Sequence, residues 1–90
     1  MEDKYMEMLI AISESIKERQ ESFARFGGIV ASTPGYRIKL KPSNDWFAKI
    51  DWLEANGYIR FGLREWCDIT GSYVETYELT ELGKEIVGRR

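Results

Sequence analysis

Histidine is absent from this 90-residue chain, and Cys67 is its single cysteine. One cysteine excludes an internal disulfide, and without histidine the common zinc-ligand sets cannot be assembled. We therefore expect no metal site and no cofactor. A chain that uses so little cysteine suits a reducing compartment, so a cytoplasmic location is expected.

Long apolar runs and catalytic signatures are also missing. The N-terminal stretch MEDKYMEMLI carries acids within its first turn, which predicts neither a membrane span nor a signal peptide. The chain contains no G-x-S-x-G motif, no phosphate-binding P-loop and no G-x-G-x-x-G fingerprint. We expect that the protein is not an enzyme and that it has no catalytic residues.

The charge balance excludes a general attraction to nucleic acid. Thirteen basic and fifteen acidic side chains give a net charge of -2, so any nucleic-acid binding requires a local basic patch. Hydrophobic residues make up 43% of the chain and charged residues 31%, which is typical of a globular protein. A chain this short supports one core, so residues 1–90 are expected to form a single domain.

The N-terminal third has a helical pattern. Apolar residues recur at spacings of three, four and seven from Tyr5 to Phe26, which predicts one amphipathic helix from about Asp3 to Phe26, ended by Gly27-Gly28. Such a helix would be roughly 35 Å long at 1.5 Å per residue, more than a domain of this size needs. Either it breaks near Arg19-Gln20, where the apolar stripe lapses, or its overhang pairs with a second subunit in a homodimer.

Residues 28–41, GIVASTPGYRIKLK, alternate as strands do. Two short strands joined by a turn at Pro34-Gly35 are expected. The second strand places three cations on one face: Arg37, Lys39 and Lys41. These cations either guard an exposed sheet edge against aggregation or form a ridge that binds phosphates or carboxylates.

A second helix is predicted from about Asn44 to Ala55, capped by Ser43 and ended by Asn56-Gly57. Its expected buried stripe is Trp46, Phe47, Ile50 and Leu53. The exposed side carries Asp45, Asp51 and Glu54 against Lys49 alone, which is the wrong sign for a DNA groove. Trp52 lies off the stripe, where it either serves as a protein-binding residue or packs under the first helix.

A β-hairpin follows, with its turn near Thr70-Gly71-Ser72. Simple alternation puts Ile59, Phe61 and Leu63 on one face and Arg60, Arg64 and Trp66 on the other, which conflicts with the parity of the returning strand. A β-bulge at Gly62 would resolve the conflict. Trp66, Tyr73 and Tyr77 are expected to form a cross-strand aromatic ladder or a binding surface. Thr80 then caps a last helix from Glu81 to about Val87, with Leu82 and Ile86 turned inward.

Residues 43–87 resemble the C-terminal half of a winged-helix domain. In that family "L-x-x-x-G-y-i" leads into a wing, here LEANGYI, and "Y-x-L-T-x-x-G" leads out of it, here YELTELG. The resemblance implies an α+β fold: a small winged-helix-like domain with a long N-terminal helix, two β-hairpins, a central helix and a short C-terminal helix. It also implies a nucleic-acid-binding or transcription-regulatory function, with DNA contacts from the basic strand and the wing. The expected contact residues are Arg37, Lys39, Lys41, Arg60 and Arg64.

The acidic central helix supports a second hypothesis. A small acidic protein-binding module, such as an inhibitor or adaptor from a virus or mobile element, would meet a protein surface and bind no nucleic acid. Its contacts would come from the central helix and the aromatic wing: Asp51, Trp52, Glu54, Trp66 and Tyr73.

Overall fold

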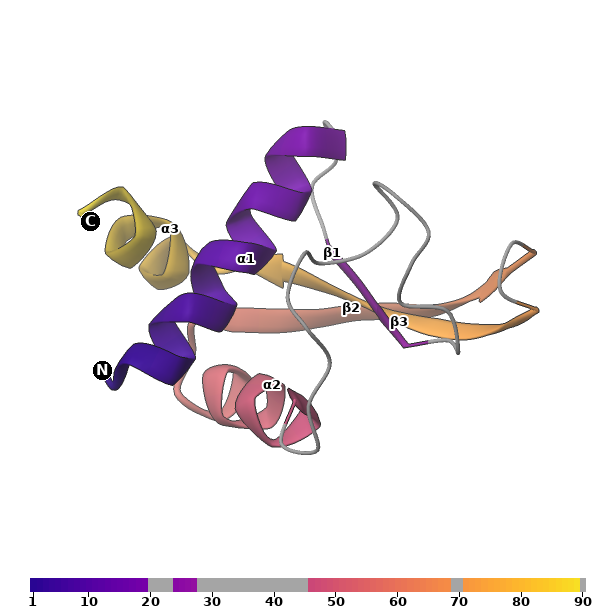
Figure 1. The fold of residues 1–90 in the computed structure, drawn as a ribbon, viewed down its shortest axis with the longest axis horizontal. Helices are drawn as coiled ribbons and strands as arrows, with labels where there is room; N and C mark the ends of the chain where they lie inside the picture. The colour runs from indigo at the N-terminus through magenta and orange to yellow at the C-terminus, as the bar shows by residue number, and fades with distance from the viewer. Residues whose placement is uncertain (20–23, 28–45, 69–70, 90) are drawn as a thin grey trace.

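The computed structural model describes residues 1–19, 24–27, 46–68 and 71–89. In these ranges the elements follow in the order α1 (Asp3–Arg19), β1 (Ala24–Gly27), α2 (Trp46–Ala55), β2 (Ile59–Cys67), β3 (Ser72–Leu79) and α3 (Glu81–Gly88). The predicted α+β class is therefore confirmed. Helices α1, α2 and α3 gather at one end of the sheet, and the far end of the β2–β3 hairpin projects away from them (Figure 1). The strand predicted to carry Arg37, Lys39 and Lys41 lies outside the described residues.

Helix α1 is shorter than the apolar spacing predicted. It ends at Arg19, and Ala24–Gly27 form the strand β1, so a continuous helix to Phe26 is wrong and the alternative of a break near Arg19 is confirmed. The break falls where the apolar stripe lapses after Ile16. The four residues of β1 pair with β3 instead. The sheet therefore provides hydrogen-bond partners for backbone N–H and C=O groups that would otherwise bond within a helix. The helical overhang that suggested a second subunit is therefore absent.

Within the described residues the sheet has three antiparallel strands in the order β1-β3-β2. Strand β3 is central because it pairs with β1 on one side and β2 on the other. The register places Ala24 and Phe61 on either side of Tyr77. Residues that face each other across a ladder share one face of the sheet, so Ala24, Phe61 and Tyr77 lie on the same face.

The core lies between this sheet face and the helices. Met8, Leu9 and Ile12 of α1 are fully buried, and Ile50 and Leu53 of α2 pack into the same cluster. The predicted inner stripe of α2 is correct at those two positions but wrong at Phe47, which is 59% exposed. At a spacing of three from Ile50 and six from Leu53, Phe47 lies at the edge of the buried stripe, and it points outward.

Glycine ends α2 as the sequence predicted. Gly57 has φ 82°, the left-handed conformation that glycine adopts without steric cost. The Gly57 N–H donates to the Glu54 carbonyl and the Tyr58 N–H to the Leu53 carbonyl, the paired bonds of a Schellman motif. This exit turns the chain directly into β2.

The last helix is tied to that exit. The Thr80 hydroxyl accepts from the Gly83 N–H at 3.1 Å and donates to the Gly57 carbonyl at 2.5 Å, so one side chain caps α3 and joins it to the α2–β2 turn. Gly83 and Val87 form the buried side of α3. Leu82 is 42% exposed, so its predicted inward position is wrong.

Candidate functional site

The outer side of α2 presents one ring and two carboxylates. Phe47, Asp51 and Glu54 are exposed, and their spacing of four and then three places them on one side of the helix. Ile50 and Leu53, on the adjoining side of the helix, lie in the core. The orientation of this surface is therefore fixed by the burial behind it.

The hairpin carries paired aromatic and charged side chains. Across the ladder Phe61 opposes Tyr77, and Trp66 opposes Tyr73. Both aromatic pairs meet edge to face, with ring centroids 5.7 Å apart in the first and 5.2 Å in the second. The predicted ladder is thus correct for Trp66 and Tyr73, whereas Tyr77 pairs with Phe61. Trp66 and Tyr73 remain more than half exposed.

A β-bulge sets which residues share this hairpin face. The register shifts between Phe61 and Arg64, so Gly62 and Leu63 together oppose Thr76. The Thr76 hydroxyl accepts from the Leu63 N–H at 2.8 Å and donates to the Leu63 carbonyl at 3.1 Å, replacing ladder bonds that the extra residue displaces. A Cβ on Gly62 would lie 2.6 Å from that hydroxyl oxygen, which explains the glycine.

The predicted bulge at Gly62 is therefore confirmed, and it changes the grouping of the hairpin residues. Beyond the bulge, Arg64 and Trp66 lie on the same face as Phe61, since each opposes the corresponding β3 residue of that face. Arg60 precedes the bulge and lies on the other face. The two hairpin arginines proposed to contact nucleic acid together are thus on opposite faces of the sheet.

Tyr77 lies where the α2 surface and the hairpin face meet. Its hydroxyl donates to the Glu75 carboxylate at 3.3 Å. Burial raises the pKa of Tyr77 above its ordinary value, and the negative charges of Glu75, Glu54 and Asp51 raise it further.

These residues form one surface, which we call the acidic-aromatic face. It combines the outer side of α2 with the hairpin face beyond it: Phe47, Asp51, Glu54, Phe61, Arg64, Trp66, Tyr73 and Glu75. Figure 1 shows α2 lying alongside β2, with the hairpin continuing past the end of the helix. Four residues of the protein-binding hypothesis belong to this surface: Asp51 and Glu54 on α2, and Trp66 and Tyr73 on the hairpin.

The cations of the hairpin are already engaged. The Arg60 Nε donates to Glu78 at 2.6 Å across the ladder. The Arg64 guanidinium carbon lies 4.9 Å from the centre of the Tyr73 ring, a cation–π contact. Arg64 therefore contributes its charge within a surface that otherwise carries carboxylates.

Trp52 is partly buried against the core and is not part of the acidic-aromatic face. Its ring stacks on Tyr5 of α1 with centroids 4.0 Å apart and an interplanar angle of 7°. Tyr58 lies on the same indole at 6.0 Å. The alternative that Trp52 packs under the first helix is therefore confirmed.

The end of the hairpin is held by a local contact. The Trp66 indole N–H donates to the Asp68 carboxylate at 2.8 Å, which fixes the ring beside the turn. Gly71, with φ 65°, supplies the left-handed residue of the predicted turn. An exposed indole with its polar atom already paired offers its apolar ring to a partner.

Two classes of site receive no support from the parts of the chain that the structure describes. Within residues 1–19, 24–27, 46–68 and 71–89, no group of three or more acidic or cysteine side chains is arranged to hold a metal ion. Over the same ranges, no helix is both long enough and apolar enough to cross a bilayer.

Comparison with known proteins gives no assignment. The chain matches no protein-family model, no curated protein and no solved structure. The physical character of the acidic-aromatic face is therefore the basis for a functional proposal.

The sequence pattern missed three members of this face. The apolar spacing places Phe47 in the buried stripe, simple alternation groups Phe61 with Leu63 rather than with Arg64, and nothing separates Glu75 from the other surface acids. The spacing Phe47–Asp51–Glu54 was a usable signal, because these positions share one helix side. Glu75 can be grouped with this face only after the bulge at Gly62 is placed, because the bulge sets the register in which Glu75 opposes Arg64.

Proposed function

We propose that this domain is a protein-binding module whose acidic-aromatic face holds a basic segment of a partner protein. The observation that carries the proposal is that α2, with its exposed acids Asp51 and Glu54, lies alongside a hairpin whose face carries Glu75 and the exposed rings of Trp66 and Tyr73. Among the described residues, this face carries three acids, Asp51, Glu54 and Glu75, and one cation, Arg64.

Carboxylates and aromatic rings together suit arginine. A guanidinium forms paired hydrogen bonds with a carboxylate and also stacks on aromatic rings, whereas a lysine ammonium does only part of this. The contact of Arg64 with Tyr73 is an example of such stacking within the chain itself. Exposed tryptophan and tyrosine are also the residues that contribute most to binding energy at protein interfaces.

The test is fluorescence anisotropy of a labelled arginine-serine repeat peptide titrated with the protein. We expect saturable binding at low ionic strength that weakens with salt and is tighter than binding to the matching lysine-serine peptide. The double variant Asp51→Lys with Glu54→Lys should weaken binding at least tenfold. Equal affinity of that variant and the wild type would refute the proposal.

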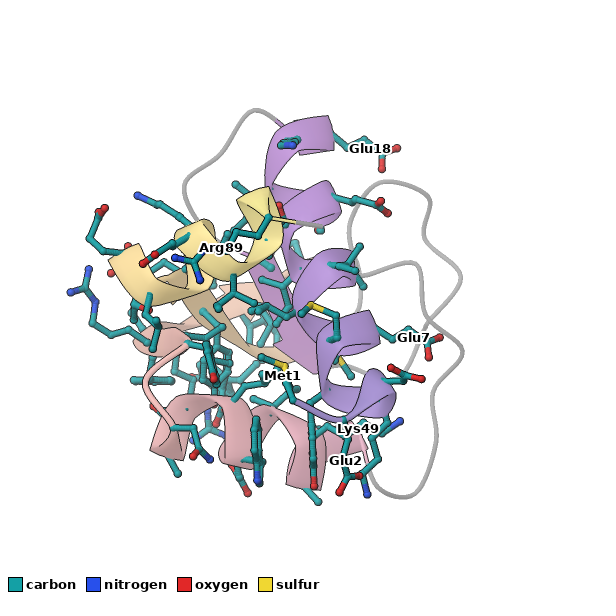
Figure 2. All side chains as sticks on the ribbon, turned by 90° about the vertical axis from the view of Figure 1, so that its left-hand side faces the viewer. Met1, Glu2, Glu7, Glu18, Lys49 and Arg89 are labelled. Carbon is teal, nitrogen blue, oxygen red and sulfur yellow. The ribbon has the colours of Figure 1, made fainter. Side chains whose placement is uncertain are left out.

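A matched control separates an effect of the acidic-aromatic face on peptide binding from an effect of net charge. Glu7→Lys with Glu18→Lys makes the same change of charge on exposed positions of α1. Figure 2 shows both glutamates pointing outward from that helix. If this control weakens peptide binding as much as the α2 variant, the attraction is general and the proposed face is not the site.

Nucleic-acid binding by a winged-helix-like regulator is the second candidate. It is supported by the order of elements, in which α2 leads into the β2–β3 hairpin and α3 follows, the order expected for the C-terminal half of a winged helix. Contacts would come from Arg37, Lys39 and Lys41 with Arg60 and Arg64. Neutralising five phosphates would give a log-log salt slope of about -4.5.

The same anisotropy measurement distinguishes the protein-binding module from the nucleic-acid-binding regulator. A labelled random-sequence DNA duplex replaces the peptide, and Arg37→Glu with Lys39→Glu replaces the α2 variant. Duplex binding that this variant abolishes would favour the regulator, whereas peptide binding without duplex binding would favour the protein-binding module. Light scattering on the same samples tests for a homodimer, as a species of twice the chain mass.

A further inference from the structure

A second candidate site lies between α1, the end of β3 and α3. Two adjoining hollows occur there, with volumes of about 390 and 270 Å³. They share Ile16, Leu79 and Lys84 in their walls, so they form one depression with two parts. Figure 2 faces this side of the molecule, with α3 and α1 both toward the viewer. Nothing on the acidic-aromatic face contributes to these walls.

The smaller hollow has an apolar wall. Ile16 of α1, Leu79 of β3 and Val87 of α3 line it, so a hydrocarbon group placed there would touch all three elements. Concave sites that are mostly apolar, with a few polar groups that fix orientation, are the usual form of small-molecule sites.

The polar atoms at this hollow favour an anion. Lys17 and Lys84 both line it. Lys84 is paired with Glu81 at 3.5 Å, but this is an exposed pair of the kind that contributes little. The ammonium group can therefore turn toward a bound anion at small cost.

Ser13 provides an independent observation. It lines the same hollow and is only 4% exposed. Its hydroxyl makes no hydrogen bond with any of the residues that the structure describes, and a buried hydroxyl without a partner is costly. Ser13 lies one helical turn from Lys17 on the same side of α1, so one ligand group can reach both.

We propose that this depression binds a small aliphatic carboxylic acid. The hydrocarbon chain lies against Ile16, Leu79 and Val87. The carboxylate accepts a hydrogen bond from the Ser13 hydroxyl and is held by the ammonium groups of Lys17 and Lys84. The inference is independent of the proposed binding of a basic segment, because the two sites share no residue.

The probe is sodium octanoate, followed by amide chemical shifts of the full chain in solution below the concentration at which octanoate forms micelles. Saturable shifts are expected at Ser13, Ile16, Leu79 and Val87. Octylamine and octanol have the same chain length without the negative charge, and both should bind at least tenfold more weakly. Octanoate that leaves these resonances unmoved, or octylamine that binds as well, would overturn the proposal.

Gly88 allows a test that fills the site without disturbing the core. It lines the smaller hollow, and a Cβ built on it meets no atom within 4 Å. Gly88→Leu should weaken octanoate binding at least tenfold while the melting temperature stays at or above that of the wild type. Gly88→Ala is the matched control, because it adds one methyl group and should retain binding within about threefold. Octanoate binding by a folded Gly88→Leu variant at wild-type affinity would refute the location.

Discussion

Replacing Thr76 by valine removes the one hydroxyl that holds the β-bulge of the hairpin. Valine keeps the shape of the side chain, so the change isolates the two hydrogen bonds with the Leu63 N–H and carbonyl. Thr76 is 2% exposed, whereas Leu63 is 54% exposed. An unpaired backbone group costs about 1–3 kcal/mol when buried, and the exposure of Leu63 lets water recover part of this.

We therefore take about 1 kcal/mol for each lost bond, or about 2 kcal/mol in total. The higher strand preference of valine opposes this by a few tenths of a kcal/mol. In a domain of this size 1 kcal/mol lowers the melting temperature by about 4–8 °C, so Thr76→Val should melt about 8–15 °C below the wild type.

Thr76→Ser is the control, since it keeps the hydroxyl and loses one buried methyl group. Its expected cost is about 0.8 kcal/mol, less than half that of valine. Thermal and urea denaturation followed by circular dichroism measure both. If Thr76→Val is as stable as the wild type, or if Thr76→Ser loses more stability than Thr76→Val, the Thr76 hydroxyl does not hold the bulge.

Three further predictions concern other parts of the fold, each measured by denaturation. A methyl group on Gly83 would overlap the Tyr58 carbonyl oxygen, so Gly83→Ala should lower the free energy of unfolding by about 3 kcal/mol. Gly88→Ala on the same helix meets no atom and should raise it by up to about 1 kcal/mol. Equal effects of the two variants would contradict the close approach at Gly83. Trp52→Ala should lower the free energy of unfolding by about 3 kcal/mol, because the indole stacks on two rings. Trp66→Ala should lower it by about 1 kcal/mol or less, because Trp66 is 54% exposed. The reverse order would contradict the packing of Trp52 under α1. The raised pKa of Tyr77 gives folding stability that is fully present below the ordinary tyrosine pKa of 10. This stability is lost as pH rises above 10, because the unfolded chain then releases the tyrosine proton before the folded chain does. Tyr77→Phe should lack this decline, and parallel profiles of stability against pH for the variant and the wild type would refute the prediction.

Local signals predicted much of the fold. The spacing of four residues between Met8, Ile12 and Ile16 located α1, and Gly57 located the exit of α2. Thr80 marked the start of α3, since a threonine before a short amphipathic run is a common N-cap. These features depend on neighbours within one or two turns, which is why the sequence alone contains them.

Long-range pairing was the part that the sequence did not determine. Residues 24–27 read as helix because Phe26 continues the apolar spacing, yet their pairing with β3 depends on residues fifty positions further along the chain. The outward position of Phe47 likewise depends on where α2 meets the sheet. A propensity for local structure is small beside the energy of such tertiary contacts, and the tertiary contacts prevail.

The bulge at Gly62 also bears on the choice of partner. In a strand without it, Arg60 and Arg64 would lie on one face and could contact neighbouring phosphates together. With it, Arg60 is paired with Glu78 on one face, and Arg64 joins the face that carries Glu75 and adjoins Asp51 and Glu54. The two cations of the hairpin are thereby separated, while acids from two elements are brought together. Since an anionic backbone is attracted by clustered cations and a basic peptide by clustered carboxylates, this arrangement favours the basic peptide on the described surface.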